Sequence, residues 1–360
     1  MGNRYVIDWK AYAGTAVKAA AEGAVLLKND KKALPLQEGM KLAVFGRIQF
    51  DYYKSGTGSG GMINTKYVVG ILDALKEENL EIDQELEQVY RDWIMEHPYD
   101  FGSGWAQEPW SQQEMPLSGG IVERAAKVND AALVIIGRTA GEDRDAKKEA
   151  GSFYLSGEEE KMMERVCAAF DRVIVVLNVG NIIDMKWVKA YDPQAVLYVW
   201  QGGMEGGHAA AEVLMGRMNP CGKLAETWPE HYEDTPAKNY FASEGRNVEY
   251  RESIYVGYRY YQKRQIKAAF PFGFGLSYTQ FAYSDLRVEK DRAEFTVTNI
   301  GDRPGIEIAQ LYVAPKDRHG SIFRAVKELK GFTGMELEPG ESRRAVIWLD
   351  DKAFRYWNNT

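Results

Sequence analysis

The sequence is poor in the residues that usually build metal and redox sites. Its 360 residues include two cysteines and four histidines. Cys167 and Cys221 lie far apart, and neither has a C-x-x-C or Cys/His spacing, so we expect two reduced, unreactive thiols. The histidines share no local spacing that would suit a metal ion or a catalytic triad. We therefore expect no metal ion and no cofactor.

The sequence also lacks an excess of basic residues and any long apolar segment. Its 45 Lys and Arg residues are outnumbered by 52 Asp and Glu residues, for a formal net charge of −7. Without a basic cluster to neutralise phosphates, a nucleic-acid partner is not expected. The longest apolar run, VIVVLNVG from Val173, is far shorter than the roughly 20 residues that span a bilayer, and the N-terminus has no apolar signal segment. The sequence thus predicts a soluble, cytoplasmic protein with no membrane contact.

Residues 1–230 alternate short apolar runs with helical patterns. Nearly continuous apolar runs, typical of buried parallel strands, occur at AVLLKN (24–29), KLAVFG (41–46), ALVIIG (132–137), RVIVVLN (172–178) and AVLYVW (195–200). Helical periodicity marks AYAGTAVKAAAEG, KYVVGILDALKEENL, ELEQVYRDWIMEH, GGIVERAAKVND, SGEEEKMMERVCAAF and MEGGHAAAEVLMG. Ser156 and Glu159 are expected to form a capping box. This alternation predicts an α/β fold, a mostly parallel sheet sandwiched by helices, with ligands at the carboxyl ends of the strands.

The rest of the chain has a different pattern. Residues 231–270, rich in Tyr, Arg and Glu, are expected to form an irregular connector. Residues 271–360 predict an antiparallel β-sandwich with short alternating strands at LRVEK, AEFTVTN, IEIAQLYVAP, VKELKGF and SRRAVIWLD. An immunoglobulin-like or fibronectin-like sandwich has seven strands, so this one is expected to be incomplete.

A glycine loop is the first motif that suggests a ligand. GTGSGG at 56–61 fits the dinucleotide template G-x-G-x-x-G, in which the glycines directly follow a strand and open a helix. Here nine residues, RIQFDYYKS, separate the loop from the strand that ends at Gly46, and no Lys-Ser or Lys-Thr follows, as a Walker A loop requires. A nucleotide site is therefore disfavoured. A flexible surface loop and a backbone that approaches a sugar closely both remain open.

An acidic loop is the second motif. It reads GRTAGEDRDAKKEAGSFYLSGEEE and begins at Gly137. A carboxylate at the C-terminal mouth of a parallel strand is well placed for general acid catalysis on a substrate above the sheet, and Glu142 is that residue. The alternative, which spacing alone favours, is a solvated charge cluster of Glu142, Asp143, Arg144 and Asp145.

Several longer stretches resemble one enzyme family. They are, in chain order, AAEGAVLLKNDKKALPL, GTGSGG, IGRTAGEDRD with GSFYLS, WQGGMEGGHAAAEVLMGRMNPCGKLAETWP, YRESIYVGYRYY and FPFGFGLSYTQF, then VTNIGDRPGIEIAQLYV and KELKGF. Over essentially its whole length the chain resembles the non-barrel part of the glycoside hydrolase family 3 enzymes, the β-glucosidases and their β-xylosidase relatives. The last two stretches are similar to the fibronectin III-like domain of that family.

The resemblance implies an activity and a set of site residues. It implies retaining hydrolysis of terminal non-reducing β-D-glucosyl residues by two carboxylates, a nucleophile and an acid that later acts as a base. Glu142, in the Gly-Glu context of the family, would be this acid/base, with a pKa raised in the assembled site. The glycine loop would lie at the edge of the sugar site, where Gly58 allows close approach and Ser59 contacts a sugar hydroxyl.

Three further side chains are candidate contacts. Arg144 would pair with an active-site carboxylate. Trp105 or Trp110 would stack on a sugar ring, with ordinary interdomain packing as the alternative. The sequence also departs from the family here: in the widespread pattern Gly and an aromatic residue stand between Gly-Glu and Asp-Arg, whereas Asp143 and Arg144 follow Glu142 directly.

The resemblance also implies a missing part. The nucleophile of the family lies on a (β/α)8 barrel, a fold of about 250 residues, and no segment here offers one. The start of the sequence suggests the N-terminal part of a permuted member. We therefore expect the chain alone to be inactive. Its expected partners are a β-glucoside or related small oligosaccharide and a barrel, which lies either on a missing part of the polypeptide or on a second chain. A homo-oligomer is a further option. The alternatives are a non-catalytic carbohydrate-binding or dimerisation module and a nucleotide-dependent enzyme.

Overall fold

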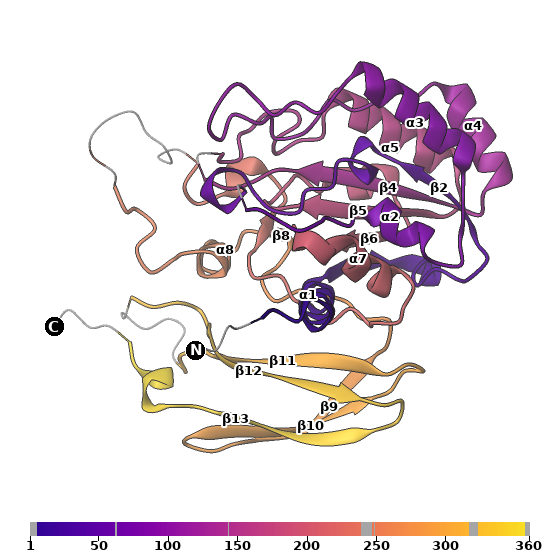
Figure 1. The fold of residues 1–360 in the computed structure, drawn as a ribbon. Coiled ribbons are helices and arrows are strands. Elements are labelled where there is room, and N and C mark those ends of the chain that lie inside the picture. The colour runs from indigo at the N-terminus through magenta and orange to yellow at the C-terminus, as the bar shows by residue number, and fades with distance from the viewer. Residues whose placement is uncertain are drawn as a thin grey trace, which may run out of the picture. The chain divides into compact units, whose positions relative to one another are not determined.

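The computed structural model of the chain describes residues 6–61, 63–142, 144–238, 247, 249–316 and 323–356. The chain divides into two units, Met1–Pro220 and Cys221–Thr360 (Figure 1). These units are defined by contacts within the structure. The domain boundaries expected from the sequence, at residues 230 and 270, stay a prediction.

A six-stranded sheet with the order β1-β6-β5-β4-β2-β3 forms the centre of the first unit. Its strands are β1 (Val25–Asn29), β2 (Lys41–Phe45), β3 (Glu81–Ile82), β4 (Ala131–Arg138), β5 (Val173–Val179) and β6 (Ala195–Tyr198). All neighbours pair in parallel except β1, which runs antiparallel to β6. The predicted α/β fold with a mostly parallel sheet is thereby confirmed. Only the direction of β1 and the two-residue strand β3 depart from the expectation.

Helices cover both faces of this sheet, because β4 and β5 are buried along their whole length and need cover on each side (Figure 1). One face carries α3 (Gln84–Glu96), α4 (Gly119–Val128) and α5 (Gly157–Ala169). The other carries α1 (Trp9–Gly23), α2 (Ile71–Lys76) and α7 (Gly206–Leu214). A short helix, α6 (Lys186–Tyr191), which the sequence did not predict, packs against α5.

The helix predicted over residues 66–80 is shorter than expected. It begins only at Ile71, because the residues before it bond to backbone elsewhere in the unit. The Gly207 amide donates to the Val69 carbonyl oxygen at 3.0 Å. A Cβ atom on Gly207 would lie 2.1 Å from the carbonyl oxygen of Gly70, so glycine is required for this approach. Tertiary hydrogen bonds therefore replace the first turn of the predicted helix.

The second unit begins with a segment that is not wholly irregular. Within the predicted connector lie helix α8 (Tyr258–Arg264) and strand β8 (Ala268–Phe270). Strand β8 pairs antiparallel with β7 (Trp228–Pro229). The connector thus contributes elements of its own to this unit.

A β-sandwich makes up the rest of the second unit. One antiparallel sheet has the order β13-β10-β9 (Ser342–Trp348, Arg292–Asn299 and Phe281–Val288), and the other pairs β11 (Gly305–Val313) with β12 (Glu328–Leu337). Side chains of both sheets share a core of Phe295, Val297, Ala309, Met335, Leu337, Ala345 and Ile347. Burial alternates along β10, as expected for a strand with one face in a core. In the described residues the sandwich has the five predicted strands.

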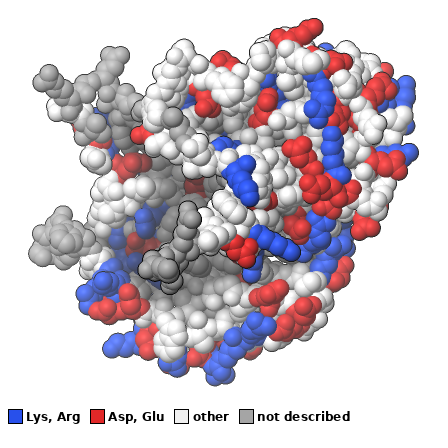
Figure 2. Space-filling model, in the orientation of Figure 1, with Lys and Arg blue, Asp and Glu red and all other residues white. Residues whose placement is uncertain are grey.

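Two surface properties bear on the expected partners. Within the described ranges, no helix combines the length and apolarity needed to cross a membrane. On the face of the first unit drawn in Figure 2, Lys and Arg side chains are mixed with Asp and Glu. A surface that binds a phosphate backbone gathers its basic side chains in one patch. That no nucleic acid binds stays a prediction, with which this mixed face agrees.

Candidate active site

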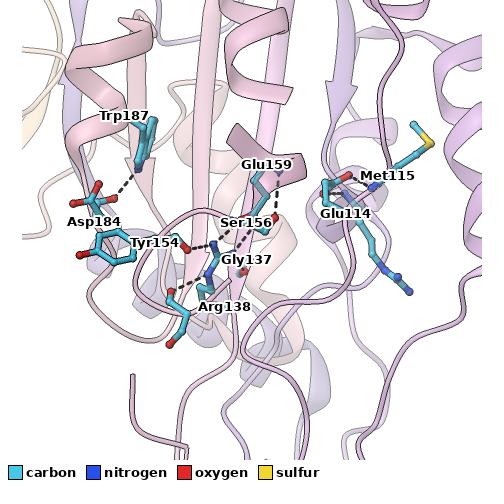
Figure 3. Close-up of polar contacts among 11 residues, drawn as sticks. Glu114, Met115, Gly137, Arg138, Tyr154, Ser156, Glu159, Asp184 and Trp187 are labelled. Atoms are coloured by element: carbon cyan, nitrogen blue, oxygen red, sulfur yellow. Dashed lines mark hydrogen bonds and ion pairs between the residues drawn. The ribbon is translucent and has the colours of Figure 1, made fainter. Parts of the chain in front are cut away.

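Strand β4 ends in an arginine that is enclosed by protein. Arg138 is 1% exposed, and all five N–H groups of its guanidinium donate hydrogen bonds (Figure 3). Two of them form a bidentate ion pair with the Glu159 carboxylate, each at 2.6 Å. The others reach the backbone carbonyl oxygens of Gly137, Ser152 and Tyr154 at 2.7 to 3.2 Å. Arg138 therefore ties the end of β4 to the residues that precede α5.

The partner of this arginine also caps helix α5. The Ser156 amide donates to Glu159 Oε2 at 2.7 Å, and the Glu159 amide donates to Ser156 Oγ at 3.3 Å, which confirms the predicted capping box. One carboxylate thus serves both the helix terminus and the ion pair. The segment 139–155, which we call the acid loop, is consequently fastened where it leaves β4 and where it enters α5.

The glycine loop at 56–61 lies directly beside the acid loop. The Thr57 amide donates to the Ala140 carbonyl oxygen at 2.6 Å, and Thr57 and Gly141 form a parallel β-bridge. A Cβ atom on Gly56 would lie 2.1 Å from the Ala140 carbonyl oxygen, and one on Gly141 would lie 2.7 Å from the Thr57 nitrogen. Glycine is therefore needed on both sides, because two backbones meet here with no room for side chains.

This pairing brings Ser59 to Glu142. The Ser59 amide and its Oγ hydroxyl both donate to Glu142 Oε2, at 3.0 and 2.7 Å. Gly58 makes the approach feasible, since it has a φ of +72° and a Cβ atom there would lie 2.5 Å from the Cβ of Glu142. The structure thus joins the glycine loop to the carboxylate, although 83 residues separate the two in sequence.

The two hydrogen bonds set the protonation state of Glu142. The Ser59 amide, and then its hydroxyl, lower the pKa of the exposed Glu142 carboxyl group below its ordinary value. In this chain Glu142 is therefore a carboxylate at neutral pH. The raised pKa that the resemblance implies belongs to a site that includes the nucleophile, and it stays a prediction.

The same contact argues against a phosphate in the glycine loop. A phosphate cradle offers backbone N–H groups at the N-terminus of a helix. Here the Ser59 amide is bonded to a carboxylate, whose negative charge would repel a phosphate. The glycines also lead into a single 3₁₀ turn, Gly58–Gly60, and not into an α-helix.

Arg144 and Trp110 pack together on the acid loop. The guanidinium carbon of Arg144 lies 4.2 Å from the centroid of the Trp110 ring, as in a cation–π contact. The Trp110 Nε1 group donates to the Asp145 carbonyl oxygen at 3.1 Å, and its own carbonyl oxygen accepts from the Thr139 amide at 2.8 Å. Trp110 is therefore hydrogen-bonded to the acid loop at two points, Thr139 and Asp145. Asp143 lies outside the described residues.

Trp105 is not brought to Glu142 by any contact among the described residues. Its side chain is 51% exposed, and it lies in the irregular segment between α3 and α4. Its predicted role in sugar stacking therefore rests on sequence alone. Trp110 is the tryptophan that the structure places against the acid loop.

A second buried carboxyl group lies in the same unit, at Glu114 (Figure 3). It accepts hydrogen bonds from the Arg47 and Met115 amides at 2.8 and 2.9 Å. Burial raises the pKa of Glu114 to about 7, against the opposing effect of these two bonds. Because the pKa is raised, the contribution of this group to stability is present at acidic pH and is lost as the pH rises toward 7. Glu114 is enclosed, 6% exposed, and we assign it to the fold.

Replacing Ser59 by alanine should raise the pKa of Glu142 toward the ordinary glutamate value of 4.5, because the variant loses the hydroxyl donor and keeps the amide. A depressed pKa means that the contribution of Glu142 to stability is present above pH 4.5 and is lost as the pH falls through the folded-state value. The Ser59→Ala variant should therefore lose less unfolding free energy than the unmodified chain as the pH falls through this range. Carbon-detected NMR titration of the glutamate carboxyl groups measures the shift, with Ser55→Ala as the control. An unmoved Glu142 titration would contradict the assigned contact.

Two known domain families match the chain. Residues 24–278 match the glycosyl hydrolase family 3 C-terminal domain. The chain belongs to glycoside hydrolase family 3. Residues 307–360 match the fibronectin type III-like domain. The family and both domain types named from the sequence are confirmed.

Relatives and solved structures of the family agree with this assignment. The chain is 44% identical to a beta-glucosidase from Ruminococcus albus and 36% identical to beta-glucosidase A from Butyrivibrio fibrisolvens, over 96% and 93% of its length. A beta-glucosidase from Paenibacillus barengoltzii, 43% identical, has a similar structure with a TM-score of 0.89 over 97% of this chain. Beta-glucosidase 3B from Thermotoga neapolitana, solved with glucose, is 37% identical with a TM-score of 0.89 over 98% of this chain.

The match covers only part of these family members. The chain spans 37% of the Ruminococcus albus relative and 46% of the Butyrivibrio fibrisolvens relative. It covers 39% of the Paenibacillus barengoltzii chain and 50% of the Thermotoga neapolitana chain. The position of this part within a complete protein, including the permuted order, stays a prediction.

Proposed function

We propose that this chain supplies the general acid/base, Glu142, of a retaining β-glucosidase that hydrolyses terminal non-reducing β-D-glucosyl residues. The observation that carries the proposal is the pair of hydrogen bonds from Ser59, which holds the Glu142 carboxylate where the glycine loop and the acid loop meet. This point follows the carboxyl end of β4, the edge at which α/β sheets bind ligands. The beta-glucosidase relatives support the reaction class.

The proposed reaction needs a second carboxylate about 5–5.5 Å from Glu142. In the first step the nucleophile attacks the anomeric carbon while Glu142 gives its proton to the departing glycosidic oxygen, which leaves a glycosyl ester on the nucleophile. In the second step Glu142 takes a proton from water, and this water attacks the anomeric carbon and releases the nucleophile. We place the nucleophile on a (β/α)8 barrel in the part of the protein that this chain does not span.

The pKa of Glu142 links this chemistry to assembly. Ser59 favours the ionised form, which suits the base of the second step. The acid of the first step requires a proton near neutral pH, and the negative charge of a nearby nucleophile would raise the pKa enough to retain it. Glu142 would thus become an acid only when the barrel is in place. We accordingly propose that the chain alone is inactive.

Four other residues are proposed to contact substrate or the nucleophile. The Gly58 backbone and the Ser59 hydroxyl would approach the sugar beside Glu142, and Trp105 would stack on a sugar ring. Arg144 would pair with a carboxylate of the assembled site. Its Nε atom is buried and has no hydrogen-bond partner among the described residues, which supports such a role. The proposed reaction requires no cofactor.

A non-catalytic carbohydrate-binding or dimerisation module is not favoured, because the family membership and the held carboxylate both suit hydrolysis. We propose a cytoplasmic location, which is supported by Cys167 and Cys221 forming no disulfide bond. Burial, and then Asp192, raise the pKa of the Cys167 thiol to about 12, so this thiol is unreactive at neutral pH. A homo-oligomer also stays a proposal.

The proposal is tested by supplying the missing barrel. The purified chain is assayed on an aryl β-D-glucoside alone and after co-expression with the segment of the Ruminococcus albus relative that it does not cover. We expect no turnover from either part alone and turnover from the complex. Turnover by the chain alone would place a nucleophile within these 360 residues and overturn the proposal. A complex that co-purifies and hydrolyses no glycoside would count equally against it.

A further inference from the structure

The second unit holds a cavity that the proposed catalysis does not use. Its volume is about 730 Å³, and its walls come from α8 and the residues that follow up to Gly273, from β11, and from Tyr283 and Lys327. Pockets that enclose small-molecule ligands measure roughly 300–1,000 Å³. The volume of this open cavity falls within that range.

Aromatic side chains form much of the wall. They are Tyr258, Tyr261, Phe272, Tyr283 and Tyr312. Tyr258 stacks on Phe272 with 4.7 Å between ring centroids and meets Tyr312 edge to face at 6.0 Å. Rings packed in this way are rigid and give apolar surface against which the C–H groups of a flat, partly apolar ligand can lie.

A glutamine in the wall, Gln310, is fixed in position by two hydrogen bonds. Gln310 Nε2 donates to the Gly273 carbonyl oxygen at 2.9 Å, and Tyr312 donates its hydroxyl to Gln310 Oε1 at 2.7 Å. Gly273 has a φ of +81°, which L side chains rarely adopt, and a Cβ atom there would lie 2.2 Å from Gln310 Oε1 and displace it, so glycine keeps Gln310 in this position. Gln310 is thus held in one orientation, and its amide group can still form further hydrogen bonds to a ligand.

Two more polar groups in the wall have acceptor capacity for a ligand. Gln262 Oε1 is buried and has no hydrogen-bond partner among the described residues. Leaving a buried acceptor unpaired is unfavourable, so a ligand hydroxyl that donated to it would bind favourably. Glu307 accepts from the Tyr283 hydroxyl at 2.7 Å and has oxygen lone pairs left. Both groups call for donors on the ligand.

The charges of the wall largely cancel. Each lysine already has an internal partner: Lys223 lies 3.6 Å from Glu307, Lys267 lies 2.6 Å from Glu230, and Lys327 lies 4.6 Å from the centroid of the Tyr312 ring. A strongly anionic ligand would meet the Glu307 carboxylate with few cations left to compensate, and a fully apolar ligand would leave Gln262 unpaired. A neutral ligand with hydroxyl groups and apolar faces satisfies both conditions.

We propose that this cavity is a second, non-catalytic binding site for a short neutral oligosaccharide. Pyranose rings would lie against the aromatic wall, and their hydroxyl groups would donate to Gln262 and Glu307 and exchange hydrogen bonds with Gln310. Glu307 is the single carboxylate among the described lining residues, so the paired carboxylates of a retaining hydrolase are not found there. The site binds sugar without cleaving it, whether or not Glu142 acts as proposed.

Titration of the isotope-labelled chain with cellotriose tests this site by NMR. We expect saturable shifts at Gly273, Gln310 and Tyr312. Gln262→Leu, which removes the unpaired acceptor and keeps the side-chain size, should weaken binding about fivefold. Tyr312→Phe keeps the ring, frees Gln310 from its fixed position, and should also weaken binding.

The control variant is Glu149→Gln, an exposed residue of the first unit outside both proposed sites, which should leave this titration unchanged. Three results would overturn the proposal: no shifts in the cavity wall at millimolar cellotriose, shifts confined to the glycine and acid loops, or unaltered affinity in both wall variants. Because none of these readouts requires turnover, failure here is distinguishable from failure of the catalytic assignment.

Discussion

Replacing Glu142 by alanine in the assembled enzyme should lower turnover of glucosides with poor leaving groups by about 10²- to 10⁴-fold, the usual contribution of general acid–base catalysis. Without the carboxyl group the departing alkoxide receives no proton, and the glycosyl ester of the second step has no base to activate water. Steady-state assays on cellobiose and on an aryl β-D-glucoside measure the loss. Glu149→Gln, which changes an exposed carboxylate on the same loop, should keep near-normal turnover.

Two further measurements separate an acid/base from a residue that only binds substrate. Dinitrophenolate leaves without a proton, so the alanine variant should still form the glycosyl ester from a dinitrophenyl glucoside and then stall. Azide needs no base: it attacks the anomeric carbon, forms β-glucosyl azide and releases the nucleophile carboxylate. Turnover that rises with azide and yields this product would identify Glu142 as the acid/base. Equal losses on both substrates with no effect of azide would refute the assignment.

The largest effect on stability is expected at the Arg138–Glu159 pair. The two side chains are 2% and 5% exposed, so Arg138→Met would leave the Glu159 carboxylate buried without its partner. Loss of one member of a buried pair typically costs about 3–5 kcal/mol of unfolding free energy. Urea unfolding of the first unit, followed with a probe within it, measures this change.

A double variant shows how much of the loss comes from the stranded charge. Arg138→Met with Glu159→Leu removes both charges and should recover part of the stability, because no charge is left stranded; the carbonyl oxygens of Ser152, Tyr154 and Gly137 still lose a donor, and the Ser156 amide loses its acceptor. Lys161→Met is the control, since it breaks an exposed pair with Glu158 on the same helix and should change stability by less than about 1 kcal/mol. If Arg138→Met proves no more harmful than Lys161→Met, the proposed fastening of the acid loop is wrong.

The elements that sequence could predict are those with a long apolar pattern. β4 and β5 are buried throughout, and burial is what makes a run continuously apolar. The same pattern cannot reveal direction, and therefore β1 reads like a parallel strand although it pairs antiparallel with β6. β3 has two residues and α6 has six, too few for a periodic signal. α2 starts late because of backbone hydrogen bonds to distant residues, which no local pattern contains.

The candidate site was predicted in pieces and not as an arrangement. Glu142 and Ser59 were each named from a motif, but the hydrogen bonds between them depend on the adjacency of β2 and β4 in the sheet. Arg138 was missed, although a charged residue at the end of an otherwise apolar strand, ALVIIGR, was a usable signal. The packing of Arg144 on Trp110 cannot be predicted from the sequence, because the two residues are far apart along the chain and share no motif.

The hold of Ser59 on Glu142 has an evolutionary consequence. The Glu142 carboxylate, the proposed acid/base, belongs to one loop, yet its position is set by another loop that follows a neighbouring strand. Insertions and deletions after Glu142 could therefore accumulate without displacing the carboxylate; in this chain Asp143 and Arg144 follow it directly. Substitution of Gly58 has no such freedom, because any side chain there would collide with Glu142. Sequence changes after Glu142 could therefore reshape the surface around this carboxylate while the carboxylate itself keeps its position.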